Sequence, residues 1–523
     1  MTFWTCGNIK RIVGGAWLAR GPAPETTDQI ALAGVSTDSR TTKPGQLFVA
    51  LRGDRFDGHR FVGDAIGAGA RAVILEDASA WTLAAATLGG AAERAVVIKV
   101  GSSGKALLKI AAAYRQALDR TRVVGVVGSN GKTTVSNLIA SVLSAGGLRG
   151  TASPKSFNNA VGVPLTILSA SPSDQYLVCE IGTNAPGEIA ALADVVRPDI
   201  VVMTSIGREH LEGFSSIQGV AREEGAVLEF VSESALVIAP ARFPAGAESL
   251  EERLKGVRNV LRFGVDPGDG GSADLRAVSV RHRSGRLEFS INNRVPVSMG
   301  LLGVHNAGNA LAAFAVARRM GLDETRIAAA LRDAKGPPMR LEVVVARSAF
   351  HPPDSAPGTF INDAYNANPD SMLASLRTFA DVSLTWPDAR RRVVILGDML
   401  EVGSATADSH REIVEAASAL GPDLLILIGP AMCEAGASAG GAVRVPGATD
   451  HAMIDAARRL MPGDLVLLKA SRGMRLERVL SAVRGELADE ARVGHASSGA
   501  SGAEIKAAPG AAAGFGAEPT RPH

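Results

Sequence analysis

The feature that most constrains this fold is a glycine-rich turn between a β-branched run and an amphipathic pattern. The segment reads VVGVVGSNGKTTVSNLIASVL and predicts a buried strand over 123–127. After the turn, apolar residues from Val135 to Leu143 recur at the i, i+3, i+4, i+7 and i+8 positions of a helix. The turn itself consists of Gly128, Ser129, Asn130, Gly131, Lys132, Thr133 and Thr134. A strand, a glycine loop and a helix in this order predict a phosphate-binding loop.

Each residue type in this loop suits phosphate chemistry. Glycines let backbone N–H groups approach phosphate oxygens, and a helix N-terminus adds about half a positive charge. Lys132 can reach the β- and γ-phosphates of a nucleotide, and Thr133 can ligate Mg²⁺. Val126 stands where the strict pattern has its first glycine, but the shorter G-x-x-G-K-T-T form is intact. The alternative is a glycine-rich turn with an exposed lysine.

Apolar runs of strand length alternate with helical patterns along most of the chain. Such alternation predicts an α/β architecture with mostly parallel strands that are buried on both faces. The predicted strands are 47–51, 72–75, 96–100, 123–127, 176–181, 200–204, 235–239, 393–396, 424–428 and 465–468.

Charge and cysteine content exclude several classes of protein. The 55 basic and 53 acidic residues leave a net charge of +2, so no strong field favours a nucleic-acid or membrane partner. The 3 cysteines are too few and too scattered for a disulfide framework or a cysteine zinc site. No apolar stretch reaches the length of about 18 residues that a membrane-spanning helix needs, and the N-terminus has no signal-peptide pattern. We therefore expect a cytoplasmic protein.

Length and two breaks in the pattern indicate the domain organisation. A chain of 523 residues predicts about three domains. The breaks lie near 118–122 and at Lys335-Gly336-Pro337-Pro338, and a polar segment within 257–297 predicts antiparallel strands. The Ala/Gly/Ser/Pro-rich end predicts a disordered tail. The expected division is 1–120, 121–337, 338–487 and a tail over 488–523.

Several motifs together resemble one enzyme family. In chain order they are GSNGKTT, SFNNAVGVPLTIL, CEIGTNAPGEI, SIGREHLEGFSS and GVHNAGNALAAFA, and this series resembles the Mur ligases of peptidoglycan synthesis. Further motifs resemble the branch that adds D-alanyl-D-alanine to UDP-N-acetylmuramoyl-tripeptide: STDSRTTKPGQLFVALRGDRFDGHRF, INDAYNANPDSM, ILGDMLEVG and KASRGMRLE. The resemblance covers about residues 30–485.

The resemblance implies a fold and a reaction. The expected domains are an N-terminal UDP-substrate domain, a central P-loop ATPase-type parallel sheet and a C-terminal Rossmann-like domain. The expected activity is amide-bond formation through an acyl phosphate, with ATP and Mg²⁺ as cofactors and ADP and phosphate as products. UDP-N-acetylmuramoyl-tripeptide and D-alanyl-D-alanine are the expected partners of a monomer.

Two alternatives stay open at this point. One is the neighbouring ligase that adds a diamino acid to the dipeptide precursor, although its usual D-N-P-R motif is absent. The other is a non-catalytic nucleotide-binding regulatory protein.

The resemblance also implies roles for individual residues. Lys132, Glu180, His210 and Arg340 are the expected catalytic residues, with Glu224 added for the reason given below, and Thr133, Glu180 and His210 are the expected metal ligands. A lone histidine is otherwise more often a structural hydrogen-bonding residue. The family often has glycine before the arginine, where this chain has Met339.

One position departs from the family. Mur ligases generally carry a lysine that becomes carbamylated in the segment after the histidine, and Glu224 aligns with it. Our hypothesis is that Glu224 supplies the negative charge directly. The alternative is a surface glutamate and an alignment that is wrong by one residue.

The remaining expected site residues bind nucleotide or substrate. For the nucleotide they are the seven loop residues with Asn306, Asn309, Arg340 and Asp363, where helix capping is the alternative for the asparagines and for Asp363. For the substrates they are Ser39, Arg40, Asp57, His59, Asn158, Asn159, Tyr365, Asn366, Asn368, Lys469, Ser471 and Arg472. Asp398, Glu401 and His410, together with Lys469, Ser471 and Arg472, are expected on the dipeptide side.

Overall fold

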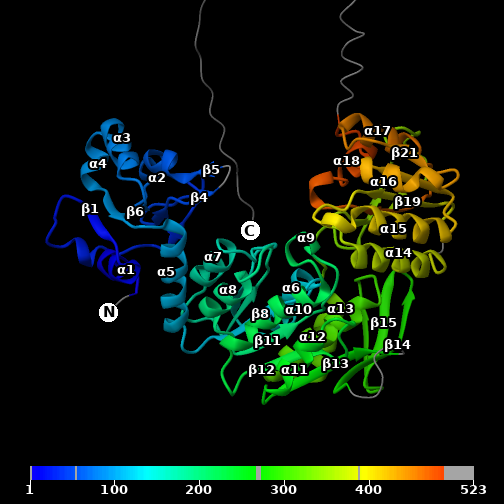
Figure 1. Ribbon diagram of the computed structural model, residues 1–523, viewed down its shortest axis with the longest axis horizontal. Coiled ribbons are helices and arrows are strands. Elements are labelled where there is room, and N and C mark those ends of the chain that lie inside the picture. The colour runs from blue at the N-terminus through cyan, green and yellow to red at the C-terminus, as the bar shows by residue number, and fades with distance from the viewer. Residues whose placement is uncertain (1–2, 54–55, 267–272, 387–388, 488–523) are drawn as a thin grey trace, which may run out of the picture.

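The computed structural model describes residues 3–53, 56–266, 273–386 and 389–487, which form three sheet-based units in a U-shaped arrangement (Figure 1). The N-terminal unit and the C-terminal unit are the two arms, and the central unit joins them at the base. The tail predicted over 488–523 lies outside the described residues. In the part of the chain that is described, no helix is both long and apolar enough to cross a membrane.

The N-terminal unit is built on a five-stranded sheet in the order β1-β7-β6-β3-β2, parallel except for β1 against β7. Its strands are β1 (Ala16–Arg20), β2 (Val35–Ser36), β3 (Leu47–Val49), β6 (Ala72–Leu75) and β7 (Val96–Lys99), with a separate ribbon of β4 (Arg52–Gly53) and β5 (Phe56–Asp57). Its helices are α1 (Cys6–Val13), α2 (Val62–Gly67), α3 (Ala78–Leu88), α4 (Gly90–Arg94) and α5 (Ser103–Ala117).

Helix α5 connects this unit to the central one. Ser102 caps its first turn, and Leu107, Ile110 and Tyr114 lie on its buried face. That face packs against α7 (Gly162–Ser169) and α8 (Glu188–Val196), and the Tyr114 hydroxyl donates to the Ala170 carbonyl at 2.7 Å. One apolar core therefore runs from the N-terminal sheet into the central unit.

The central unit carries a nine-stranded sheet in the order β16-β15-β14-β13-β12-β11-β8-β10-β9. The strands are β8 (Arg122–Val127), β9 (Gly150–Ala152), β10 (Tyr176–Glu180), β11 (Ile200–Met203), β12 (Leu236–Pro240), β13 (Val260–Val265), β14 (Leu275–Arg283), β15 (Arg286–Ile291) and β16 (Val295–Met299). Its other helices are α6 (Lys132–Ala145), α9 (Leu211–Phe214), α10 (Ile217–Glu224), α11 (Glu248–Lys255), α12 (His305–Arg319) and α13 (Glu324–Asp333).

The expectation of antiparallel strands within 257–297 is right only in part. Strands β14, β15 and β16 pair antiparallel, but β13 pairs parallel with both β12 and β14. The polar segment therefore extends the central sheet rather than forming a separate insert, because β13 supplies the edge on which β14 pairs.

The C-terminal unit has a six-stranded sheet in the order β17-β18-β22-β19-β20-β21, in which only the β17–β18 pair is antiparallel. The strands are β17 (Glu342–Ala346), β18 (Gly358–Asp363), β19 (Arg392–Gly397), β20 (Leu424–Ile428), β21 (Val443–Val445) and β22 (Leu465–Lys469). The helices are α14 (Pro369–Ser383), α15 (Thr406–Ala419), α16 (Pro430–Ala435), α17 (Asp450–Arg458) and α18 (Arg478–Val483).

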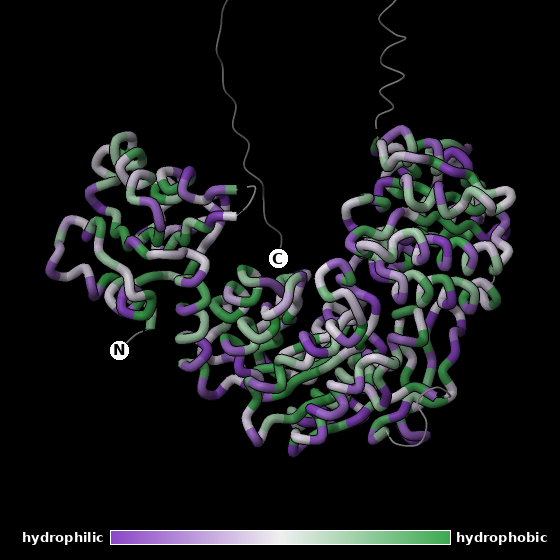
Figure 2. Tube along the Cα trace, in the orientation of Figure 1, coloured by the Kyte–Doolittle hydropathy of each residue, from purple (hydrophilic) through white to green (hydrophobic). Residues whose placement is uncertain are grey.

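The ten strands predicted from apolar runs are all present, with ends that differ by at most two residues. Figure 2 shows hydrophobic segments in the interior of each unit, where these strands lie. Strand β8 lies between β10 and β11. The strands that follow it in the sequence are placed on both of its sides, β9 and β10 on one and β11 and β12 on the other, so the strand order reverses at β8. Ligand sites of open α/β sheets lie at such a switch point, beyond the carboxyl ends of the strands.

Candidate active site

The phosphate-binding loop lies at this switch point, between β8 and α6. Gly128 and Gly131 have φ angles of 120° and 93°, which an L side chain rarely adopts. A Cβ on Gly128 would also lie 2.4 Å from the Thr204 hydroxyl, so glycine is needed there twice over. Among the described residues no side chain caps α6, which leaves its N-terminal N–H groups available to an anion.

The loop that follows β11 supports the phosphate-binding loop from one side. The Ser129 amide donates to the Ser205 carbonyl at 2.7 Å, and the Gly207 amide donates to the Ser129 hydroxyl at 2.9 Å. The backbone N–H of Asn130 donates to the Ser205 hydroxyl at 3.0 Å. These contacts hold the loop open without using its helix-side N–H groups.

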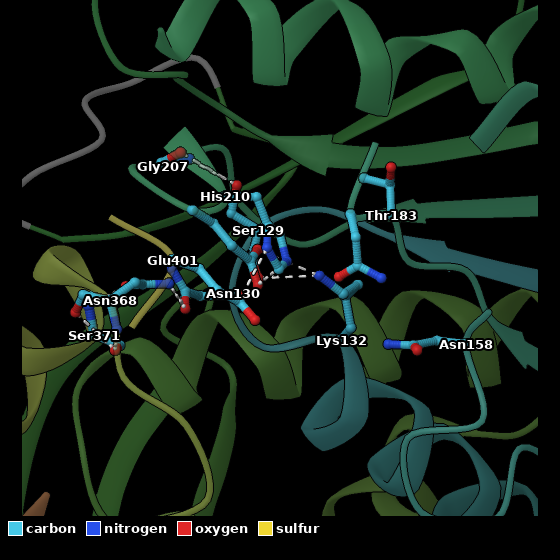
Figure 3. A network of polar contacts seen from close by, with 12 residues as sticks. Ser129, Asn130, Lys132, Asn158, Thr183, Gly207, His210, Asn368, Ser371 and Glu401 are labelled. Atoms are coloured by element: carbon cyan, nitrogen blue, oxygen red, sulfur yellow. Dashed lines mark hydrogen bonds and ion pairs between the residues drawn. The ribbon is translucent and has the colours of Figure 1, made fainter. Parts of the chain in front are cut away.

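Lys132 lies inside the site, and only 9% of its surface is exposed. The alternative of an exposed lysine in a glycine-rich turn is therefore wrong. Its ammonium donates to the Gly128 and Ser129 carbonyls and pairs with Glu209 at 3.4 Å. Burial opposes the charge, but Glu209, Glu224 and Glu180 outweigh burial and raise the pKa of Lys132. Figure 3 shows Lys132 beside His210, Asn158 and the loop residues.

Glu180 and Thr133 form the group best suited to a divalent cation. The Thr133 hydroxyl and the side-chain amide of Asn158 both donate to Glu180 Oε1, at 3.1 Å and 2.9 Å. Glu180 Oε2 is buried and has no hydrogen-bond partner among the described residues. Burial raises the pKa of Glu180, partly offset by Lys132 and Arg340. A cation would satisfy this oxygen, so the donor set fits Mg²⁺.

His210 contacts two carboxylates instead of Glu180. Its Nε2 lies 3.5 Å from Glu209 Oε1, and its Nδ1 lies 3.1 Å from Glu401 Oε2, which belongs to the C-terminal unit. Burial opposes the charge of the imidazole, but Glu209 outweighs it and raises the pKa of His210. No three His, Cys, Asp or Glu side chains within the described ranges gather as a metal cluster. An ion at Glu180 would therefore take further ligands from phosphate oxygens and water.

Glu224 lies beneath the phosphate-binding loop, at the end of α10. Its Oε2 accepts the Gly128 amide at 2.7 Å, and 2% of the residue is exposed, so the alternative of a surface glutamate is wrong. Burial raises the pKa of Glu224 to about 7, with Glu209 adding and Lys132 opposing. The preceding Glu223 accepts the Gly187 and Ile189 amides at 2.8 Å each. Glu224 thus holds α10 to the phosphate-binding loop, and Glu223 holds it to the segment at the start of α8.

Glu209 is a site residue that the sequence reasoning missed. Although burial opposes its ionisation, Lys132 and His210 lower the pKa of Glu209. The available signal was its place directly before His210 in the SIGREHLEGFSS motif. The motif drew attention to His210, whereas the role of Glu209 follows only from its contact with Lys132.

Residues of the C-terminal unit complete the site. Arg340 donates to the Thr133 hydroxyl at 3.1 Å and lies 4.3 Å from the centre of the Tyr365 ring, and its buried Nε has no partner in the described part of the chain. The Tyr365 hydroxyl donates to Ser156 at 2.7 Å. The two units therefore share one site, with an arginine directed at the first turn of α6.

Asn368 has two roles at the same junction. Its amide donates to Asn130 Oδ1 at 2.9 Å, and its Oδ1 accepts the Ser371 amide as part of a capping box on α14. Figure 3 shows Asn368, Ser371 and Asn130 together.

Asp363 and Lys469 end two neighbouring parallel strands and form an ion pair of 2.7 Å. Asp363 also accepts the Leu341 amide at 3.1 Å, so it holds a loop instead of capping a helix. Burial lowers the pKa of Lys469, against the effect of Asp363.

A cleft of about 450 Å³ lies between the central and C-terminal units, next to the phosphate-binding loop. Asn130, Thr134, Asn306, Asn309, Asp363 and Lys469 are among its lining residues. Neither asparagine caps α12, which begins at His305: the Asn306 amide donates to the Leu302 carbonyl at 2.6 Å, and the Asn309 amide donates to Asn306 Oδ1 at 2.7 Å.

Several expected substrate residues lie elsewhere or have local partners. Ser39, Arg40, Asp57 and His59 belong to the N-terminal arm, away from α6 (Figure 1). There Arg40 pairs with Asp38 at 2.6 Å, and the buried His59 accepts the Glu76 amide and contacts Asp57 at 2.7 Å.

Other expected residues form turns close to the site. Asn159 Oδ1 accepts two amides at the start of α7, and the Asn366 carbonyl accepts from Lys469. The Ser471 hydroxyl accepts the Leu400 amide at 2.9 Å, and Arg472 pairs with Glu477 at 2.9 Å.

Asp398 and His410 have structural partners within the C-terminal unit. Asp398 accepts the Met432 amide at 2.8 Å at the start of α16. His410 is fully buried between the Met399 amide and the Thr406 carbonyl. Of Asp398, Glu401 and His410, only Glu401 reaches the site, through His210.

Comparisons with known proteins agree on one family. Three family models match: "Mur ligase family, catalytic domain" over 31–115, "Mur ligase middle domain" over 126–317 and "Mur ligase, glutamate ligase domain" over 339–472. The UDP-N-acetylmuramoyl-tripeptide–D-alanyl-D-alanine ligase of Bacillus subtilis (strain 168) is 31% identical over 485 residues, which are 91% of this chain and 97% of that protein.

Solved structures show the same fold. MurF from Acinetobacter baumannii has a TM-score of 0.77 at 24% identity and covers 92% of this chain and 99% of its own. The MurF ligase from Thermotoga maritima, solved in complex with ADP, has a TM-score of 0.70 at 27% identity and covers 88% of this chain and 98% of its own.

Proposed function

This chain belongs to the Mur ligase family, and on that premise we propose that it is an ATP-dependent ligase that joins D-alanyl-D-alanine to UDP-N-acetylmuramoyl-tripeptide. The Bacillus relative bears the name of that activity and matches along nearly its whole length. The observation that carries the proposal is the junction of Arg340, Thr133 and Glu180 at the phosphate-binding loop. The junction brings the guanidinium of Arg340 from the C-terminal unit and the carboxylate of Glu180 from the central unit to the place where a γ-phosphate would lie.

The reaction needs activation of a carboxylate. A free carboxylate is a poor acyl donor, because the leaving group would be oxide. Transfer of the γ-phosphoryl group of ATP to that carboxylate gives an acyl phosphate and ADP. The amine of D-alanyl-D-alanine then attacks the acyl carbon through a tetrahedral intermediate, phosphate leaves, and the amine loses a proton.

Lys132, Arg340 and the N–H groups of α6 would stabilise the charge that develops on the transferring phosphoryl group. We propose that Glu180 and Thr133 hold Mg²⁺, with His210 as a further candidate ligand. The ion, when bound, would neutralise part of the negative charge on the phosphates. The unpartnered Oε2 of Glu180 supports this assignment.

For Glu224 we propose the role of the family's carbamylated lysine, with no CO₂ adduct. Its carboxylate already lies at the loop and interacts with Lys132, Glu209 and the Gly128 amide. The negative charge beneath the loop would help to hold Lys132 charged and directed into the site.

The other site residues keep the roles expected from the family as proposals. Asn306 and Asn309 would contact adenine and Asp363 the ribose or phosphates, since all three line the cleft. Ser39, Arg40, Asp57 and His59 would bind the uridine end of the UDP substrate in the N-terminal arm, and the loop that carries Asn158 and Asn159 would contact the UDP-muramoyl substrate. Tyr365, Asn366 and Asn368 would shape the loop ahead of Pro369, and Lys469, Ser471 and Arg472 would line the dipeptide side. We propose a monomer, because one chain supplies the whole catalytic junction. We also propose that the protein acts in the cytoplasm.

The test is phosphate release from ATP and Mg²⁺ with UDP-N-acetylmuramoyl-tripeptide. One arm adds D-alanyl-D-alanine, one replaces the substrates with the dipeptide precursor and a diamino acid, and one contains no amine. We expect release only with D-alanyl-D-alanine, together with a pentapeptide product by mass, and a loss of about 100- to 1,000-fold in Lys132→Met. Release only with the diamino acid would reassign the chain to the neighbouring ligase. ATP binding without turnover would support the regulatory alternative.

A further inference from the structure

One short loop connects the phosphate-binding loop to the C-terminal unit. Residues 205–210 follow β11, and Ser205 and Gly207 bind the phosphate-binding loop through the contacts described above. The next residue, Arg208, turns away from that loop and reaches α14 and α15. Glu209 and His210 then turn back towards Lys132 and Glu401.

Arg208 holds two carboxylates of the C-terminal unit at once. Its Nε donates to Asp370 Oδ1 at 2.8 Å, and its backbone N–H donates to the other oxygen of Asp370 at 2.6 Å. Its Nη1 and Nη2 donate to the two oxygens of Glu412 at 2.7 Å and 3.4 Å. A guanidinium is suited to this because its donors form a rigid fork, whereas a lysine offers a point charge.

The backbone shows that the loop is tightly constrained. A Cβ on Gly207 would lie 2.6 Å from Asp370 Oδ2, so the C-terminal unit packs directly against the loop. His210, two residues after Arg208, has a φ of 49°. A left-handed conformation in a residue other than glycine persists only where the surroundings impose it. His210 directly precedes α9 and lies two residues after Arg208, so the conformation occurs between two anchored segments.

We propose that Arg208 is a positioning residue that couples docking of the C-terminal unit to placement of Glu209 and His210 beside Lys132. With Arg208 bound to Asp370 and Glu412, docking brings Arg340 to Thr133 and Glu401 to His210 at the same time. Without the bridge, the C-terminal unit docks in more than one orientation, and the loop loses its anchor. The inference rests on the proposed ligase function for its kinetic readout only.

The bridge acts on geometry more than on overall stability. The side chains of Arg208, Asp370 and Glu412 are 28%, 36% and 42% exposed, and ion pairs with such exposure contribute little to folding. Loss of the bridge should therefore leave the melting temperature within about 2 °C while the chemistry slows. A role confined to stability would show the opposite pattern.

The test compares Arg208→Met and Arg208→Lys with the control Arg411→Met. Arg411 is the neighbour of Glu412 on α15, and its charge pairs with Asp408 on the same helix. We expect kcat to fall at least tenfold in Arg208→Met and less in Arg208→Lys. We expect Arg411→Met to match the wild type. A kcat within twofold of the wild type in Arg208→Met, or an equal loss in Arg411→Met, would overturn the proposal.

A double-mutant comparison tests the route through α15. If Arg208 acts through Glu412, Glu412→Ala lowers kcat, and adding it to Arg208→Met lowers kcat no further. Losses that multiply would show that the two residues act independently, which contradicts the proposal.

Hydrogen exchange separates this inference from the proposed reaction. In the ligand-free protein we expect Arg208→Met to increase exchange at 204–212 and 365–371 and to leave 122–127 unchanged. Unchanged exchange at 204–212 and 365–371 would overturn the inference even if the enzyme is a ligase. A wild-type protein with no dipeptide-dependent phosphate release would refute the proposed function, and the exchange comparison would still decide on the bridge.

Discussion

Glu224 illustrates how much one buried carboxylate can contribute at the scale of a residue. Burial raises its pKa from 4.5 to about 7, so the folded protein binds this proton more tightly than the unfolded chain does. Its contribution to stability is therefore complete below about pH 4.5 and is lost as the pH rises through about 7. Between pH 5 and pH 8 we expect the wild type to lose about 2–3 kcal/mol that Glu224→Gln does not lose. Urea unfolding at both pH values measures the difference, and parallel pH profiles would contradict it.

The same substitution tests the proposed catalytic role of Glu224. The glutamine can still accept the Gly128 amide, but it removes the charge beside Lys132. We expect kcat of Glu224→Gln to fall roughly 10- to 100-fold, by analogy with other losses of charge stabilisation, and the Mg²⁺ dependence to change. Wild-type activity should be the same in buffer depleted of CO₂. Full activity with unchanged Mg²⁺ dependence would show that the charge is not needed.

Met339 shows the cost of a departure from the family at one backbone position. It has a φ of 57°, so the turn before Arg340 keeps a left-handed conformation that glycine adopts more easily. We expect Met339→Gly to preserve Arg340 at Thr133 and to change the free energy of unfolding by less than about 1 kcal/mol, because the relief of left-handed strain is offset by the greater entropy that glycine loses on folding. Denaturant unfolding with an activity assay checks this, and loss of activity would mean that the methionine side chain itself is required.

At the scale of an element, α6 offers a matched pair of glycines. Gly131 precedes the helix with a φ of 93°, and Gly147 follows it with a φ of 87°. A Cβ on Gly131 would lie 2.8 Å from Asn309 Oδ1, whereas a Cβ on Gly147 meets nothing within 4 Å. The backbone strain is thus similar, and only the first site adds a clash with α12.

We expect Gly147→Ala to cost about 1 kcal/mol of stability and to leave nucleotide affinity unchanged, since strain is its only effect. Gly131→Ala should cost about 2–3 kcal/mol because strain and a clash combine, and it should weaken ADP binding at least tenfold. Calorimetric titration with ADP and urea unfolding measure the two quantities. Equal nucleotide affinity in the two variants would mean that the contact between α6 and α12 does not shape the site.

At the scale of the whole molecule, the cleft joins two units that a bound nucleotide should stabilise together. ADP at 100 times its Kd should add about 2.7 kcal/mol to the free energy of unfolding, with no gain in Lys132→Met. Because Asn130 and Asp363 both line the cleft, we expect slower hydrogen exchange in 128–134 and in 363–371. Protection confined to 128–134 would show that the nucleotide does not bridge the units.

Much of the fold could be predicted because its signals are local. The strand, loop and helix around Lys132 appear in one stretch of sequence, and each predicted apolar run forms a strand. The error in 257–297 arose because β13 pairs in parallel with strands on both sides, a pairing that its own polarity does not encode. The interpretation of His410 was similarly limited, since only packing shows that it is fully buried inside its unit.

By itself the sequence determined the phosphate-binding loop, the α/β architecture and the family, because glycine spacing, apolar runs and motifs are properties of neighbouring residues. Only the tertiary structure decided which charges surround Lys132. Glu209 lies 77 residues away along the chain, and the amide that Glu224 binds lies 96 residues from it. It also decided that Arg208 joins Glu412 across 204 residues. Contacts at such separations depend on how sheets and helices pack, so no local pattern specifies them.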